Sequence, residues 1–274
     1  MSKIGQALRD AAKLLGETSD TARLDAELLM AHALGMSRSD MLLRGGDWDV
    51  PDKFSALVDR RSRHEPVAYI LGHQEFYGRE FLVNSDVLIP RGDSETIVDA
   101  ALAVCRDNAR ILDLGTGSGA LLLSLLAERP DSNGIGFDAS LGAVSIAAAN
   151  AAKLGVADRA HILHGDWTLP GWADDLGTFD VIVANPPYVE TTAQLDPAVR
   201  DFEPAAALFA GEEGLDDYRI LIPQFRTLLV QGGVIVLEIG HEQDQAVAAI
   251  AGEYGFETTL QRDLAHRPRA LLLR

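Results

Sequence analysis

The chain has 274 residues, and its 47% hydrophobic and 24% charged content is typical of an ordinary globular protein. Its one cysteine, Cys105, excludes a disulfide framework and a cysteine-based metal site. The formal net charge of −17 disfavours DNA and RNA as partners, because proteins that bind them neutralise phosphates with clustered Lys and Arg; the acidity could equally serve solubility alone. No stretch approaches the ~20 apolar residues of a membrane span, and the N-terminus lacks a signal-peptide pattern. We therefore expect a cytoplasmic protein that binds neither membrane nor nucleic acid. A monomer is our separate expectation and does not follow from these numbers.

Residues 1–72 are predicted to form a small helical domain. In residues 22–35, ARLDAELLMAHALG, apolar side chains recur at helical spacing, and the glycine ends the run. Pro51 precedes a second helical stretch at residues 52–65. Gly45 and Gly46 indicate the turn between these two stretches. The region contains no catalytic constellation.

The rest of the chain predicts a hairpin linker followed by an α/β domain. Within the linker, residues 73–90, the aromatic-rich stretch 74–83 is divided by Gly78, which is typical of a hairpin. In residues 91–274 apolar strands alternate with helical runs, which indicates a doubly wound, parallel sheet. The last two strands resemble a closing pair. The helices are expected at residues 119–128, 140–154 and 214–229.

A glycine-rich segment, DLGTGSG at residues 113–119, follows a predicted strand and begins a helix. Its three glycines let the backbone turn sharply and approach a ligand closely. Asp138 ends the next strand, where a carboxylate can accept from both hydroxyls of a ribose. Because NAD enzymes and methyltransferases both hold an adenosine in this way, the loop predicts a nucleoside cofactor of either kind.

Two further features favour S-adenosylmethionine over NAD. Asp113 lies two residues before the first glycine, well placed for the amino group of an amino-acid moiety. The third strand ends in Asp166 and Trp167, where a carboxylate can accept from the adenine amino group and an indole can stack on the purine. A core aromatic is the alternative interpretation of the tryptophan. The predicted cofactor-binding residues are Gly115, Thr116, Gly117, Ser118, Gly119, Asp138, Asp166, Trp167 and Asn185.

The sharpest motif is the tetrapeptide Asn185-Pro186-Pro187-Tyr188, which follows the fourth strand directly. Ligands bind beyond the carboxyl ends of strands in an open α/β sheet, so these four residues are predicted to bind the substrate beside the glycine loop. The Asn185 carboxamide and the Pro186 carbonyl can accept from an NH2 group, and Tyr188 offers a flat face to a planar amide or base. We therefore predict Asn185, Pro186 and Tyr188 as catalytic. A rigid strand-ending turn is the alternative.

The chemistry of an amide nitrogen explains this arrangement. Its lone pair is delocalised into the carbonyl, and two acceptors that draw its hydrogens out of plane would restore the lone pair. Orientation and electrostatic preorganisation then suffice, so no metal is expected. The seven histidines have no metal-ligand spacing. Glu238 ends a strand near the predicted site, but solvation at the surface or capping explains it equally well.

These motifs resemble class I methyltransferases that modify glutamine, above all the peptide chain release factor N5-glutamine methyltransferase family. Besides DLGTGSG, GDW and NPPYV, the segments EPVAYILGHQEFYGREFLV, VRDFEP and GLDDYR resemble family segments, and Gly92 replaces a usual proline. The resemblance implies a Rossmann-like seven-stranded sheet, S-adenosylmethionine as cofactor, and methyl transfer to the glutamine of the Gly-Gly-Gln motif in class I release factors. It also implies that the helical domain of residues 1–72 helps to dock the release factor.

Two other acceptors stay open at this point. A sister enzyme methylates a ribosomal-protein glutamine and shares NPPY. Nucleic-acid adenine-N6 methyltransferases use a similar tetrapeptide on another planar NH2 group, but they need a basic track for the nucleic-acid backbone. Here the arginine-rich run at residues 60–63, RRSR, is isolated in the helical region of an acidic chain. A purely binding role is disfavoured because the motifs are intact.

Overall fold

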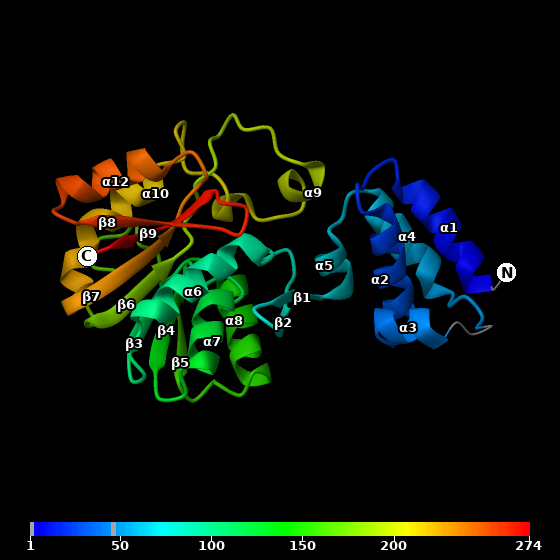
Figure 1. Cartoon of the computed structure of the whole chain (residues 1–274), viewed down its shortest axis with the longest axis horizontal. Coiled ribbons are helices and arrows are strands. Elements are labelled where there is room, and N and C mark those ends of the chain that lie inside the picture. Colours follow the sequence, from blue (N-terminus) through cyan, green and yellow to red (C-terminus); the bar gives the residue numbers. More distant parts are fainter. Residues whose placement is uncertain (1–2, 45–47) are drawn as a thin grey trace. The chain divides into compact units, whose positions relative to one another are not determined.

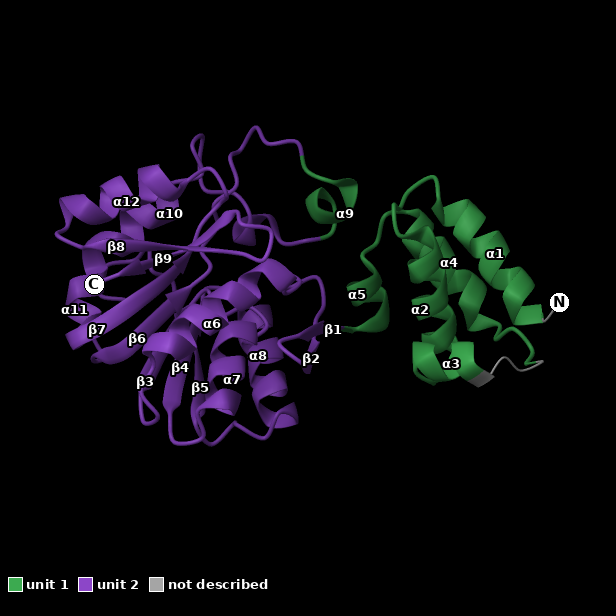
Figure 2. Ribbon diagram, in the orientation of Figure 1, with its two compact units in different colours: residues 1–73, 195–202 green, residues 74–194, 203–274 purple. Residues whose placement is uncertain are grey.

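The computed structural model describes residues 3–44 and 48–274, so Gly45 and Gly46, the predicted turn, lie outside the described residues. The chain divides into two compact units (Figure 2). One contains residues 1–73 and 195–202, and the other contains residues 74–194 and 203–274. The short segment at residues 195–202 is thus separated in sequence from the rest of its unit.

The first unit is helical (Figure 1). Its core consists of apolar side chains that recur at helical spacing, such as Leu8, Ala11 and Leu15 of the first helix, all of which are buried. Gly35 adopts a left-handed conformation at the end of the second helix, as a glycine can without strain. The helices are α1 (Lys3–Leu15), α2 (Ala22–Leu34), α3 (Arg38–Arg44), α4 (Lys53–Ser62), α5 (Val67–Leu71) and α9 (Pro197–Arg200).

The arginine-rich run at residues 60–63 is neutralised inside this unit. Arg61 donates to Asp25 at 2.7 Å, and both side chains are largely buried. Arg60 pairs with Glu65, and Arg63 pairs with Asp59 one turn earlier on α4. These arginines therefore have carboxylate partners within the fold.

The second unit is built on a sheet of seven strands in the order β5-β4-β3-β6-β7-β9-β8. β3 to β7 pair in parallel, and β9 runs antiparallel to both of its neighbours, β7 and β8. A separate two-stranded hairpin, β1 (His73–Phe76) and β2 (Arg79–Leu82), precedes the sheet. The sheet strands are β3 (Arg110–Leu114), β4 (Asn133–Asp138), β5 (Ala160–His164), β6 (Phe179–Ala184), β7 (Leu229–Glu238), β8 (Thr258–Arg262) and β9 (Pro268–Leu273).

Helices cover both faces of this sheet, and alternate strand residues supply the two cores. Ile111 packs with α6 (Glu95–Val104), α7 (Ala120–Glu128) and α8 (Leu141–Lys153), whereas its neighbour Leu112 belongs to the opposite core. That opposite core contains α10 (Asp216–Leu221), α11 (Phe225–Leu228) and α12 (Asp244–Glu253).

The single helix expected at residues 214–229 is divided in the structure. A 3-10 turn, Ile222–Gln224, separates α10 from α11. Pro223 lies in this turn, and a proline has no amide hydrogen for a helical hydrogen bond. In the described part of the chain no helix is long and apolar enough to cross a membrane. No cluster of metal-ligand side chains occurs among residues 3–44 and 48–274.

Candidate active site

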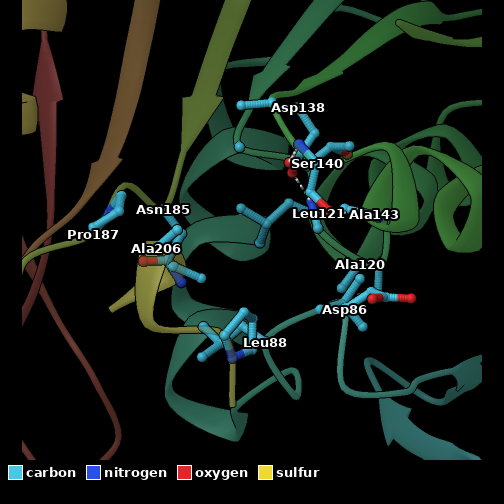
Figure 3. A pocket seen from close by; sticks show the side chains of 18 of the residues that line it. Asp86, Leu88, Ala120, Leu121, Asp138, Ser140, Ala143, Asn185, Pro187 and Ala206 are labelled. Carbon is cyan, nitrogen blue, oxygen red and sulfur yellow. Dashed lines mark hydrogen bonds between the residues drawn. The ribbon is translucent and has the colours of Figure 1, made fainter. Parts of the chain in front are cut away.

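A cavity of about 530 Å³ lies within the second unit, at the carboxyl ends of β3, β4 and β6 (Figure 3). Figure 3 shows Asn185 and Ala206 on one side of it, and Ser140 and Ala143 on the other. Gly119, Pro186 and Tyr188 are not among the residues that line it. The predicted site residues on its wall are Gly115, Thr116, Gly117, Ser118, Asp138, Asp166, Trp167, Asn185 and Pro187.

The glycine loop turns under the cavity between β3 and α7. Gly115, Gly117 and Gly119 have φ values of 73°, 55° and 84°, a region that only glycine adopts readily. At Gly119 a Cβ atom would lie 2.7 Å from Cδ1 of Leu123, so the loop also needs glycine for its packing against α7. Gly119 therefore shapes the loop, while Gly115 and Gly117 face the cavity.

Asp138 ends β4 beside this loop and lines the cavity. Its Oδ2 accepts from the Gly117 amide at 2.8 Å, and its Oδ1 accepts from the Ser140 amide at 2.9 Å. Burial raises the pKa of its carboxyl, and these two backbone donors oppose that shift. The carboxylate thus braces the loop and still borders the space in which a ligand can bind.

Trp167 packs against the core, as the alternative interpretation of this side chain expected, and it also lines the cavity. Its indole Nε1 donates to Oδ1 of Asp217 at 2.9 Å. The neighbouring Asp166 accepts from the hydroxyl and the amide of Thr168, which lowers the pKa of its carboxyl. Asp217 also lines the cavity, and sequence reasoning did not single it out, since the partner lies 50 residues away.

Asp113 does not line the cavity, contrary to the role expected for it from its place before the first glycine. Its side chain is fully buried, and Oδ2 accepts from the Thr116 hydroxyl at 2.7 Å and from the Leu122 amide at 3.3 Å. Burial raises the pKa of this carboxyl to about 7. The contacts make Asp113 an internal support of the glycine loop.

The tetrapeptide extends from β6 to the cavity, with Asn185 and Pro187 on the wall. The Tyr188 hydroxyl donates to Oε1 of Glu238 at 3.2 Å. Glu238 is only 2% exposed, so the interpretation that it is solvated at the surface is wrong. Burial raises the pKa of its carboxyl to about 7.

Two further buried side chains support the site from a distance in sequence. The Asn150 carboxamide on α8 accepts from the Leu82 amide at 2.7 Å and donates to the Ser118 carbonyl at 2.8 Å. Glu203 accepts from Arg91 and from the Ile89 amide. The sequence offered one signal for Glu203, which lies in VRDFEP, a segment that resembles a family segment, and Arg91 precedes Gly92, which replaces a usual proline.

Comparisons with known proteins match both units. Residues 6–72 match the PrmC N-terminal domain, and residues 95–214 match the methyltransferase small domain. A release factor glutamine methyltransferase of Rhodospirillum rubrum is 43% identical over 92% of this chain and 78% of that protein. A protein of the same name from Agrobacterium fabrum is 40% identical over 85% of this chain and 83% of its own length. This chain belongs to the release factor glutamine methyltransferase family.

Membership in the release factor glutamine methyltransferase family confirms the resemblance predicted from the motifs, and with it an enzyme of the methyltransferase class. The predicted Rossmann-like fold is confirmed as well. A methyltransferase from Pyrococcus furiosus superposes with a TM-score of 0.55 at 15% identity, covering 78% of this chain and 97% of that chain. The glycine loop and the tetrapeptide both lie within the matched methyltransferase domain.

Proposed function

We propose that this chain transfers a methyl group from S-adenosylmethionine to the side-chain nitrogen of the glutamine in the Gly-Gly-Gln motif of class I peptide chain release factors. The observation that carries the proposal is that Asn185 shares one cavity with the glycine loop, in a chain of the release factor glutamine methyltransferase family. A substrate-binding carboxamide thereby borders the space for a nucleoside cofactor. We further propose that the enzyme acts as a monomer in the cytoplasm, where release factors work.

The residues of the cavity fit S-adenosylmethionine. Gly115 and Gly117 have no side chains, so their backbone atoms form part of the cavity wall and a ligand can approach them closely. Asp138, at the end of β4, has carboxylate oxygens that can accept hydrogen bonds from ribose hydroxyls. The Trp167 ring borders Gly115 so closely that a Cβ there would fill the gap. We propose that this ring and Asp166 receive the adenine, and that the complete set is Gly115, Thr116, Gly117, Ser118, Gly119, Asp138, Asp166, Trp167 and Asn185.

The tetrapeptide Asn185–Tyr188 is proposed to bind the glutamine. Bound S-adenosylmethionine supplies an electrophilic methyl group on a positively charged sulfur. The Asn185 side-chain oxygen and the Pro186 carbonyl accept the two amide hydrogens and hold them out of the amide plane. The nitrogen lone pair is then less delocalised, and its direction is set by the two acceptors. Pro187 keeps the segment extended, and the Tyr188 ring limits the orientations of the amide.

The domains divide this work in our proposal. Residues 1–72 dock the release factor, residues 73–90 are the hairpin linker, and residues 91–274 carry the methyltransferase site. A nucleic-acid substrate is the weaker candidate, because the arginines at 60, 61 and 63 already pair with carboxylates and the net charge is −17. A ribosomal-protein glutamine is the remaining alternative and is decided by experiment.

The test is transfer of a radiolabelled methyl group to four acceptors offered in parallel. They are a class I release factor, the same factor with its Gly-Gly-Gln glutamine changed to alanine, a mixture of ribosomal proteins, and duplex DNA. We expect label on the intact release factor alone. Label on ribosomal protein or DNA would keep the methyltransferase class but replace the substrate. Equal label on the intact and the altered release factor would mean that the methylated residue is not the Gly-Gly-Gln glutamine.

A further inference from the structure

Glu238 lies buried beside the substrate-binding tetrapeptide, at the end of the neighbouring strand. β6 and β7 pair in parallel, with Ala184 opposite Leu237. Asn185 and Glu238 each follow directly after these last paired residues, so both lie at the carboxyl edge of the sheet. Glu238 is 2% exposed, and its Oε2 has no hydrogen-bond partner among the residues that the structure describes. A buried carboxylate is costly, so its contacts need an explanation.

The polar neighbours of this carboxylate include Ser94 and Tyr188, the last residue of the tetrapeptide. Tyr188 donates its hydroxyl to Oε1 of Glu238 at 3.2 Å. The backbone end of the same tyrosine is held by Gln243, whose Nε2 donates to the Tyr188 carbonyl at 3.0 Å and to the Gly214 carbonyl at 3.2 Å. Tyr188 is thus held at both ends, and three residues before it Asn185 faces the cavity.

Ion pairing with Arg269 does not by itself explain why the Glu238 carboxylate is buried. The guanidinium Nη1 is 3.9 Å from Oε1 of Glu238, beyond hydrogen-bond distance. The same guanidinium donates to Asp93 at 2.9 Å and lies 3.7 Å from Asp263. Arg269 therefore keeps two carboxylates if Glu238 is replaced, and its charge does not become unpaired.

We propose that Glu238 is a positioning residue for methyl transfer. Glu238 accepts a hydrogen bond from the Tyr188 hydroxyl, and this bond holds the Asn185–Tyr188 segment in the conformation in which Asn185 faces the cavity. The inference rests on the proposed function, in which this segment binds the acceptor amide. Glu238 itself touches neither the cofactor nor the amide in this proposal, because it does not line the cavity. It acts only through Tyr188.

The kinetic test compares Glu238→Ala, Glu238→Gln, Tyr188→Phe and the Ala/Phe double variant. Misplaced substrate-orienting groups slow the chemical step, so we expect Glu238→Ala to lower kcat for release-factor methylation roughly tenfold. Glu238→Gln should restore most of the rate, since its amide oxygen can still accept the tyrosine hydroxyl. In the Tyr188→Phe background, Glu238→Ala should cause no further loss. The dissociation constant of S-adenosylmethionine should change less than about twofold in every variant.

Asp263→Asn is the matched control. Asp263 is another buried carboxylate beside Arg269, but it has no contact with Tyr188 in the structure, and its Oδ1 accepts from the amides of Ala265 and Arg267. This control should retain kcat. Equal losses in Asp263→Asn and Glu238→Ala would overturn the proposal in favour of a general role of the charge cluster. Losses from Glu238→Ala and Tyr188→Phe that multiply in the double variant would overturn it as well.

A spectroscopic measurement separates this inference from the proposed function. In protein labelled with carbon-13 at the tyrosine Cζ position, the Tyr188 signal is assigned as the one missing from Tyr188→Phe. The proposal expects this signal to move in Glu238→Ala and to stay in Asp263→Asn; an unmoved signal in Glu238→Ala would overturn it. Failure of the wild-type chain to methylate release factors would refute the proposed function, whereas the tyrosine signal would still report whether Glu238 holds Tyr188.

Discussion

The ring of Trp167 lies against the backbone of Gly115, so closely that a Cβ atom at position 115 would be 3.2 Å from Cη2 of the indole. Gly115 also has a φ of 73°, which side chains rarely tolerate. Gly115 directly follows β3, and Trp167 lies shortly after β5. Their contact joins two separate segments of the cavity wall, and several variants can test what that wall binds.

Gly115→Ala should weaken the binding of S-adenosylmethionine. The added methyl group pushes on the indole and strains the loop, and we expect the dissociation constant to rise roughly tenfold or more and the unfolding free energy to fall by about 1 kcal/mol. Calorimetry and urea unfolding measure the two effects. Gly35→Ala is the control, because Gly35 has a φ of 69° with no atom within 4 Å of an added Cβ. Equal affinity in Gly115→Ala and the wild type would contradict the proposed cofactor site.

Asp138→Ala should remove the acceptor proposed for the ribose hydroxyls. Charged hydrogen bonds of this kind contribute about 1–3 kcal/mol, and the loss of the bond to the Gly117 amide should add to the effect. We expect a correspondingly weaker dissociation constant for S-adenosylmethionine by calorimetry. Asp158→Ala, at an exposed position of the same unit, should bind as tightly as the wild type. If Asp138→Ala does the same, the ribose binds elsewhere.

Asn185→Ala should abolish methyl transfer and leave cofactor binding largely intact. The variant loses the side-chain acceptor proposed to orient the amide, while the glycine loop and Asp138 are untouched. Radiolabel transfer and calorimetry on the same preparation measure the two properties. Asn133→Ala, at an exposed position at the start of β4, is expected to behave as the wild type. A loss of affinity as large as the loss of rate would reassign Asn185 to cofactor support.

Asp113→Asn should change how stability depends on pH. Burial raises the pKa of Asp113 from 3.8 to about 7 in the folded chain. Between these values the folded state keeps a proton that the unfolded state has released, so the unfolding free energy falls as pH rises through this window. An asparagine has no such proton. Urea unfolding at about pH 5 and about pH 8 should therefore show the variant gaining stability relative to the wild type at the higher pH. An unchanged difference would contradict the raised pKa.

Much of the fold could be predicted because its signals are local. The alternation of apolar strands with helical runs predicts an α/β sheet, and the expected helices at 119–128 and 140–154 correspond closely to α7 and α8. Pro223 shows where such reasoning was too coarse, since it divides the helix expected at 214–229. The backbone requirements of glycine and proline act within a few residues, and a sequence displays them directly.

By itself, the sequence determined that a glycine loop and an Asn-Pro-Pro-Tyr turn each follow a strand. It predicted that the two lie close together, because ligands bind beyond the carboxyl ends of the strands in an open α/β sheet. Only the tertiary structure decided which side chains support them. In the structure, Glu238 is buried and bonded to Tyr188, Asp217 accepts a hydrogen bond from Trp167, and Asp113 does not line the cavity. These relationships join segments far apart in the chain, and burial and hydrogen bonding between such segments arise only when the chain packs.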